Sequence, residues 1–235
     1  MSDNGATLKI LAVGSVHAYL DMLADDPASH EYVFDASFAP AGAVMAQVRD
    51  GFQADIVIST LTALDALSHD GFLTDGTAMP IGRTELALAQ RAGTPVQSIP
   101  TTDALRTLLL DVQSIYLPDT TRSTAGQHMA RLFDRLGILE DIGPKLKQFA
   151  NGSQTMHALA ESSDASAIGF TQRSEIVAVK ALVAGPALPA DCALTTTYAA
   201  ALGAKSTAPQ TARRFIGWIC GPGTESLRAS LGFSA

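Results

Sequence analysis

Ile10-Leu11-Ala12-Val13-Gly14-Ser15-Val16-His17 joins a short apolar run to a helical pattern at 18–24 through a Gly-Ser turn. The apolar run predicts a strand that is covered on both faces, as in a parallel sheet. The start of the following helix exposes main-chain N–H groups and the positive end of the helix dipole, so it can receive a small anion. Ser15 therefore has two interpretations at this point, as a cap on the helix and as a contact to a ligand.

The same rhythm repeats twice further along the chain. Apolar stretches at 32–38 and 54–60 predict two more strands, and helical patterns follow Pro40-Ala41-Gly42 and begin again at Leu61. Alternating strands and helices predict an α/β fold with a parallel sheet. All three strands end in small or hydroxyl residues, Ser59 among them. In open α/β sheets the ligand lies at the carboxyl ends of the strands.

From about residue 80 the pattern changes but remains mixed α/β. Strands are expected at 83–90, 114–119, 147–149, 167–172, 181–185 and 195–202. Helices are expected at 104–112, after Gly126, and at 151–162, 211–219 and 225–231.

Charge and composition limit the possible partners and locations. The net charge of −7 over 235 residues argues against nucleic acid, which requires a basic face. A small anion would have to be held locally, by N–H groups, hydroxyls and one or two arginines. No signal peptide is recognised and the apolar runs are too short to span a membrane. We therefore expect no membrane insertion and a cytoplasmic location, or a periplasmic one if the chain is a trimmed mature form.

Motifs for metal and cofactor chemistry are not recognised in the sequence. The cysteines, Cys192 and Cys220, are expected to be free thiols, and no Cys/His cluster has zinc spacing. There is no phosphate-binding Gly-x-x-x-x-Gly-Lys-Ser/Thr loop and no Gly-x-Ser-x-Gly elbow. We expect no metal site and no cofactor.

Several segments together resemble the periplasmic molybdate-binding proteins and their relatives, which have the type II solute-binding fold. The segments are 12–15, 38–42, 48–59, 136–138, 169–175 and 185–189. The resemblance implies two lobes joined by two crossover strands that act as a hinge. One lobe would comprise 1–79 plus 197–235, and the other 80–196. The ligand would lie in the cleft between the lobes, which close on it by hinge motion.

The resemblance also implies positions for the ligand contacts. A serine follows the first strand of the molybdate binders, and Ser15 matches it. The turn after the second strand has lost its serine and leaves Ala41 and Gly42. In the second lobe the matching positions are Ala125 with Gly126, Ser153, and Gln172, which replaces a tyrosine.

Two arginines suggest a different ligand. Arg122 and Ser123 directly precede the first of these second-lobe helix starts, and Arg173 follows Gln172. A guanidinium fork suits a carboxylate, so we expect a small organic carboxylate or an oxyanion. The alternative interpretation of Arg122 is a solvated loop charge, and that of Arg173 is a pairing with Glu175 or another acid.

The resemblance extends to enzymes, because aconitate isomerase is similar to a molybdate-binding protein. Moving a double bond in an unsaturated polycarboxylate requires a general base near a carbon acid. His17 is the best candidate for that base, with a histidine on the helix surface as the alternative interpretation, and Glu175 is a weaker candidate. A transporter permease is an expected partner only if the protein is exported.

Overall fold

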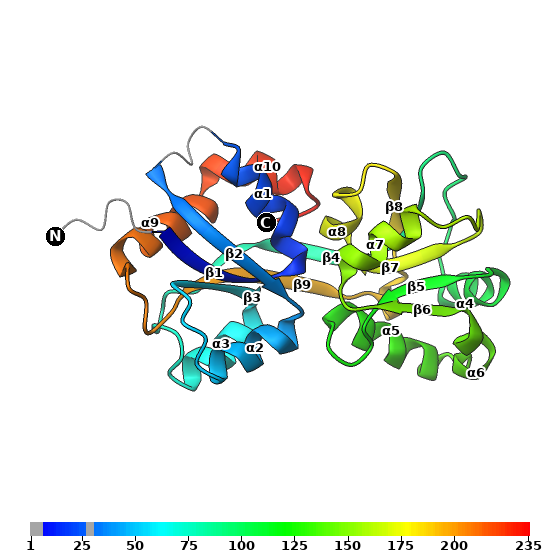
Figure 1. The fold of residues 1–235 in the computed structure, drawn as a ribbon. Helices are drawn as coiled ribbons and strands as arrows, with labels where there is room; N and C mark the ends of the chain where they lie inside the picture. Colours follow the sequence, from blue (N-terminus) through cyan, green and yellow to red (C-terminus); the bar gives the residue numbers. More distant parts are fainter. Residues whose placement is uncertain (1–6, 27–30) are drawn as a thin grey trace. The chain divides into compact units, whose positions relative to one another are not determined.

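A computed structural model describes residues 7–26 and 31–235, which form two compact units (Figure 1). The first unit is drawn from Met1–Arg83 and Thr197–Ala235, and the second is Thr84–Thr196. The chain passes from the first unit to the second within strand β4 (Met79–Arg91) and returns within β9 (Thr195–Leu202).

The sheet of the first unit has the order β2-β1-β3-β9. Strands β1 (Thr7–Val13), β2 (Val33–Ala39) and β3 (Ile56–Thr60) are parallel, and β9 runs antiparallel to β3. The interior of β1 is buried on both faces, as its nearly continuous apolar sequence predicts. The predicted strand–helix rhythm of the first 70 residues is therefore confirmed.

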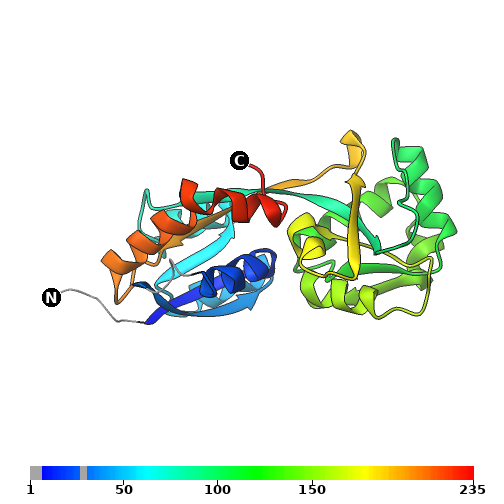
Figure 2. The same cartoon turned by 90° about the horizontal axis from the view of Figure 1, so that it is seen from above.

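Helices cover both faces of this sheet. Helices α2 (Ala41–Arg49) and α3 (Leu61–His69) lie on one face, and α1 (His17–Ala24), α9 (Pro209–Ile219) and α10 (Glu225–Ser230) lie on the other (Figures 1 and 2). The Tyr19 hydroxyl of α1 donates to the Ile219 carbonyl at the end of α9 over 2.5 Å. Helix α1 ends at Ala24, as the helical pattern at 18–24 predicts, and Pro27, which follows it, lies outside the described residues.

A buried carboxylate connects the sheet of the first unit to α9. Asp55 is 3% exposed and accepts hydrogen bonds from the Lys9 N–H, the Ser206 hydroxyl and the Thr207 N–H at 2.7–2.9 Å. Burial alone would raise the pKa of Asp55, but these hydrogen bonds outweigh burial and lower it. Asp55 is thus a structural residue, which ties the start of β3 to the segment before α9.

The second unit has a sheet with the order β4-β7-β5-β6, and β8 (Leu182–Ala187) pairs with β4. Strands β5 (Ile115–Pro118), β6 (Leu146–Phe149) and β7 (Ile168–Gln172) are parallel, while β7 and β8 are antiparallel to β4. Each face of the sheet has its own hydrophobic core.

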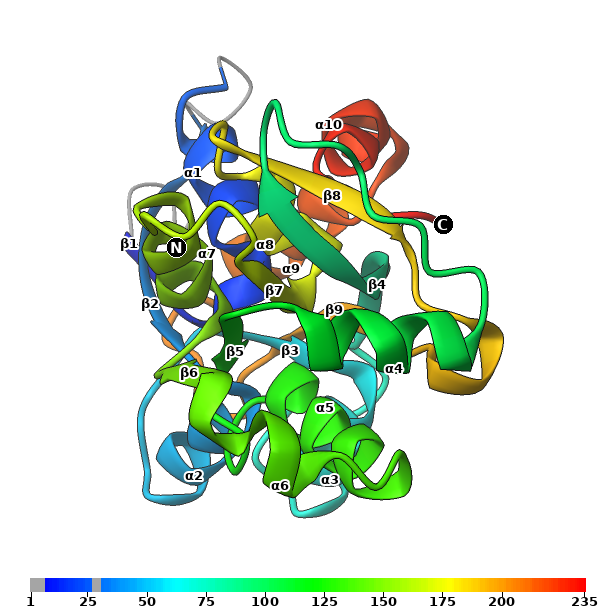
Figure 3. The same cartoon turned by 90° about the vertical axis from the view of Figure 1, so that its right-hand side faces the viewer.

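One core of the second unit involves α4 (Thr102–Asp111), α5 (Thr124–Arg135) and α6 (Leu139–Ile142). The other involves α7 (Gly152–Ala160) and α8 (Arg173–Val177). Figure 3 shows these two helices on the other side of the sheet from α5 and α6. Cys192 and Cys220 are free thiols, as expected. Within residues 7–26 and 31–235, no helix is long and apolar enough to cross a membrane.

Candidate anion-binding site

The three parallel strands of the first unit end at one edge of its sheet. Val13 pairs with Ala39, and Ala12 pairs with Ile58, so the carboxyl ends of β1, β2 and β3 are aligned. The turn before α1 and the starts of α2 and α3 follow directly. Four predicted contacts lie at or next to this edge: Ser15, Ala41, Gly42 and Ser59.

Ser15 does not cap the helix that follows it. A 3₁₀ turn, Gly14–Val16, precedes α1, and no side chain caps the first turn of that helix. Instead, the Ser15 hydroxyl donates to the Tyr198 hydroxyl of β9 over 3.0 Å. The capping interpretation of Ser15 is therefore wrong, because the extra 3₁₀ turn moves the helix start beyond the serine. Tyr198 is a site residue that the sequence analysis missed.

The other predicted positions of this edge differ in accessibility. Ala41 and Gly42 begin α2, where the first main-chain bonds run from Ala43 and Val44 to the Pro40 carbonyl. The N–H groups of Ala41 and Gly42 precede these bonds and so face out of the helix start. Ser59 is fully buried, and its hydroxyl has no hydrogen-bond partner within the described part of the chain.

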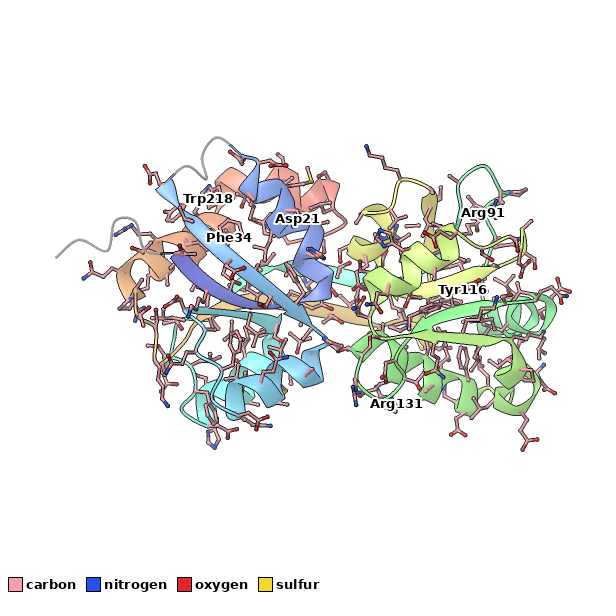
Figure 4. The ribbon with its side chains drawn as sticks, in the orientation of Figure 1. Asp21, Phe34, Arg91, Tyr116, Arg131 and Trp218 are labelled. Carbon is pink, nitrogen blue, oxygen red and sulfur yellow. The ribbon has the colours of Figure 1, made fainter. Side chains whose placement is uncertain are left out.

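His17, the candidate base, lies at the same edge in a defined environment. Its ring stacks on Phe38 at the end of β2, with 3.9 Å between ring centroids and 29° between planes. Its Nε2 lies 3.5 Å from an Asp21 carboxylate oxygen, one turn later on α1 (Figure 4 labels Asp21). The His17 and Asp21 side chains are 45% and 66% exposed. Neither Asp21 nor Phe38 was identified from the sequence.

The parallel strands of the second unit also end together. Pro118 pairs with Phe149, and Ile115 pairs with Ile168, so β5, β6 and β7 are aligned with their carboxyl ends at one edge. Helices α5, α7 and α8 begin at this edge. The predicted contacts Arg122, Ser123, Ala125, Gly126, Ser153 and Gln172 lie on or immediately before these helices.

The loop before α5 is built around Asp119. One Asp119 carboxylate oxygen accepts from the Thr121 hydroxyl and N–H and from the Arg122 N–H, at 2.7–3.0 Å. The Thr121 hydroxyl makes the largest contribution to lowering the pKa of Asp119. The guanidinium of Arg122 is exposed and forms no ion pair with any described residue. This loop thus presents a charged fork just before a helix start.

The start of α5 is tightly packed. The Ser123 hydroxyl caps the helix by accepting from the Gly126 N–H over 3.4 Å. A Cβ at Gly126 would overlap with the main-chain oxygens of Pro118 and Asp119. Ala125 is buried beside it. Residue 126 must therefore be glycine for the first turn of α5 to approach the end of β5 so closely.

The start of α7, like that of α5, is capped by a side chain. The Asn151 side chain caps it by accepting from the Gln154 N–H over 2.9 Å, and the Thr155 N–H reaches the Asn151 carbonyl. The N–H groups of Gly152 and Ser153 precede these bonds and so face out of the helix start.

Gln172 and Arg173 are engaged within the second unit. Gln172 is 2% exposed, and its side-chain amide donates to the Thr196 hydroxyl over 3.1 Å. Arg173 pairs with Glu85 at 2.8 Å and also donates to the Gly185 carbonyl. The expectation that Arg173 pairs with an acid is confirmed, with Glu85 rather than Glu175 as its partner.

Comparisons with known proteins agree with this architecture. The family described as bacterial extracellular solute-binding protein matches residues 8–234. The periplasmic molybdate-binding protein of Azotobacter vinelandii superposes with a TM-score of 0.80 at 16% identity, over 97% of this chain and 99% of that one. The sulfate-binding protein SubI of Mycobacterium tuberculosis has a TM-score of 0.73 at 17% identity, over 97% and 86% of the two chains. The α/β solute-binding fold expected from the sequence is confirmed.

One enzyme is also similar in sequence. An aconitate isomerase from a Pseudomonas species is 28% identical over 167 residues, which is 71% of this chain. The matched segment spans 62% of the length of that curated relative.

Proposed function

This chain belongs to the bacterial extracellular solute-binding protein family, and we propose that it binds a small anion, specifically an organic carboxylate. The observation that carries the proposal is the set of helix starts at the carboxyl edges of both sheets. At α2, α5 and α7 main-chain N–H groups face out of the helix, where they and the helix dipole favour negative charge.

Arg122 supports a carboxylate over a tetrahedral oxyanion. Its guanidinium is exposed and forms no salt bridge with a described acid, although its charge helps to lower the pKa of Asp119, whose carboxylate holds the Arg122 main chain before the start of α5. A guanidinium can donate two parallel hydrogen bonds to a carboxylate. The turn at Ala41 and Gly42 offers no hydroxyl, which leaves fewer side-chain donors around a tetrahedral anion.

Ligand-induced stabilisation tests the proposal. Thermal unfolding would be followed with citrate, cis- and trans-aconitate, sulfate, molybdate and tungstate, because a ligand at 100 times its Kd stabilises by about 2.7 kcal/mol. We expect at least one carboxylate to raise the unfolding temperature more than the oxyanions do. Stabilisation by molybdate or tungstate alone would refute the carboxylate assignment, and no response to any anion would refute anion binding.

A paired substitution tests the role of Arg122. Arg122→Ala should weaken carboxylate binding measured by calorimetry by at least about 1.5 kcal/mol, or roughly tenfold. Arg131→Ala removes the same charge from an exposed position further along α5 and serves as the control (Figure 4). If Arg122→Ala and Arg131→Ala bind the carboxylate with equal affinity, Arg122 does not contact it.

A second candidate function is isomerisation of an unsaturated polycarboxylate such as aconitate. It is supported by the His17 ring, which has Phe38 against its face and the Asp21 carboxylate beside Nε2. In such a reaction His17 would take a proton from the carbon next to the double bond. The electron pair would move along the carbon skeleton, and a proton would return at the other end.

An ultraviolet assay of cis- and trans-aconitate interconversion distinguishes the two functions. If the protein is an isomerase, His17→Gln should abolish turnover and leave the affinity for aconitate within about threefold. Tight binding with no turnover by the wild-type protein would leave only the binding function.

We further propose that the protein acts outside the cytoplasm together with a membrane permease. The description of its family as extracellular supports this location. This differs from the cytoplasmic location expected when the sequence is read as written. Fractionation of the native host, with antibody detection, separates the two locations.

A further inference from the structure

A buried carboxyl group lies beneath the first residue of α7. Glu175 is 8% exposed and lies in the first turn of α8, after β7. A Cβ at Gly152, the first residue of α7, would overlap with the Glu175 carboxylate and the Thr171 hydroxyl. The absence of a side chain at residue 152 therefore lets the carboxyl group reach the start of α7.

Hydrogen bonds hold this carboxyl group in place. The Thr171 hydroxyl donates to a Glu175 carboxylate oxygen, and the main-chain N–H of Gln172 contributes a second hydrogen bond. Gln172 occupies the N-cap position of α8 and Glu175 is the third residue of that helix, so the second bond is the glutamate half of a capping box, without a side-chain bond from Gln172 in return. Both bonds come from neutral donors, so neither supplies a compensating charge.

Few charged groups lie on the elements packed against Glu175. Strands β7 and β8 contain no titratable residue, and α7 contains only His157, which is exposed and bonded to the Ser153 carbonyl. On α8 itself Arg173 is paired with Glu85. The other charge near this helix is Lys180, which is exposed in the segment after it. No cation on these described elements forms an ion pair with Glu175.

We infer that Glu175 is a positioning residue that couples anion binding at the start of α7 to the uptake of one proton. The inference rests on the proposed function, because it concerns an anion held by the Gly152 and Ser153 N–H groups. An ionised Glu175 would place a second negative charge beside that anion in a poorly solvated environment, where like charges repel strongly. A proton from solvent removes this repulsion by neutralising the carboxylate, and no covalent bond to the anion forms or breaks.

Two further observations support the inference. Burial raises the pKa of Glu175 to about 7, so both of its forms are present near neutral pH. The Ser174 hydroxyl, in the same first turn of α8, is 3% exposed and has no hydrogen-bond partner among the described residues. It is therefore a buried donor on α8 that no group of the described chain uses.

Calorimetry tests the coupling directly. Binding of sulfate, molybdate and fumarate, whose charges stay constant between pH 6 and pH 8, would be measured in two buffers of different ionisation enthalpy. At pH 7.5 we expect uptake of more than about half a proton for each anion bound. Affinity should fall about tenfold from pH 6 to pH 8, because anion and carboxylate repel each other.

Three variants assign the proton to Glu175. Glu175→Gln should bind without proton uptake and with a flat pH profile, whereas His157→Gln, the control on α7, should behave as the wild type does. Thr171→Val removes a donor to the carboxylate and should move the midpoint of the affinity profile to higher pH. This last variant keeps the carboxyl group and provides a test if Glu175→Gln does not fold.

The outcomes separate the two proposals. Tight binding with no proton uptake by the wild type, or unchanged uptake in Glu175→Gln, would overturn the coupling and leave anion binding intact. An unshifted midpoint in a folded Thr171→Val protein would also overturn it. If no binding is detected at pH 6 or pH 8 for sulfate, molybdate, fumarate or any anion of the thermal panel, the proposed function fails. The coupling then fails with it.

Discussion

Replacing Glu175 with glutamine should change how the stability of the protein depends on pH. Burial raises the pKa of this carboxyl group from 4.5 to about 7 in the folded chain. Between these values the folded state holds more protons than the unfolded state, so stability falls as the pH rises. The destabilisation is absent below about pH 4.5 and complete above about pH 7. At about 1.4 kcal/mol per pH unit, it amounts to about 3 kcal/mol.

Urea unfolding of the wild type and Glu175→Gln at pH 5, 6, 7 and 8 measures this quantity. Glutamine has nearly the same shape and no charge, so the variant should gain about 2.5 kcal/mol relative to the wild type between pH 5 and pH 8, since part of the effect is already present at pH 5. Glu140→Gln removes the same charge from an exposed position of the same unit and controls for net charge. If the wild-type and Glu175→Gln profiles stay parallel to within about 1 kcal/mol, burial of an ionisable carboxyl group at this position is refuted.

Three other substitutions test hydrogen bonds and packing in the two units. Asp55→Asn should destabilise the protein by about 3 kcal/mol in urea, because it removes a buried charge that accepts several hydrogen bonds; a loss below 1 kcal/mol would contradict that role. Gly126→Ala should lower the unfolding temperature by several degrees, equivalent to about 2 kcal/mol, since its Cβ would overlap with main-chain oxygens. Tyr198→Phe removes the hydrogen-bond partner of Ser15 and should weaken anion binding, measured by calorimetry, about threefold to tenfold. An affinity equal to that of the wild type would show that the Ser15–Tyr198 pair does not take part in binding.

The sequence predicts the local parts of the fold well. The strand ends after Val13 and before Pro40 follow from apolar runs that stop at glycine, proline or small residues, and these signals are contained within about ten residues. The cap of α4 is equally local, since Thr101 accepts from the Ala104 N–H three residues later. Where a strand end or a helix cap depends only on residues close together in the chain, the sequence is sufficient to predict it.

The contacts that define the candidate site depend on residues far apart in the chain. Ser15 and Tyr198 are 183 residues apart, and only the pairing of β9 with β3 brings the tyrosine to the end of β1. In the sequence Glu175 lies just beyond the end of the strand expected at 167–172, and α8 is not predicted there. Glu175 is buried because Gly152, on another helix, leaves room for it. No pattern within five residues of α8 carries that information.

The two edges offer an anion different kinds of donor. In the first unit the Ser15 hydroxyl donates to Tyr198, so it must turn to reach an anion. In the second unit the selective groups are charged: the Arg122 guanidinium attracts an anion at every accessible pH, whereas Glu175 repels it only when ionised. Hydroxyl geometry in the first unit should therefore affect affinity equally at all pH values, whereas the contribution of Glu175 in the second unit should depend on pH.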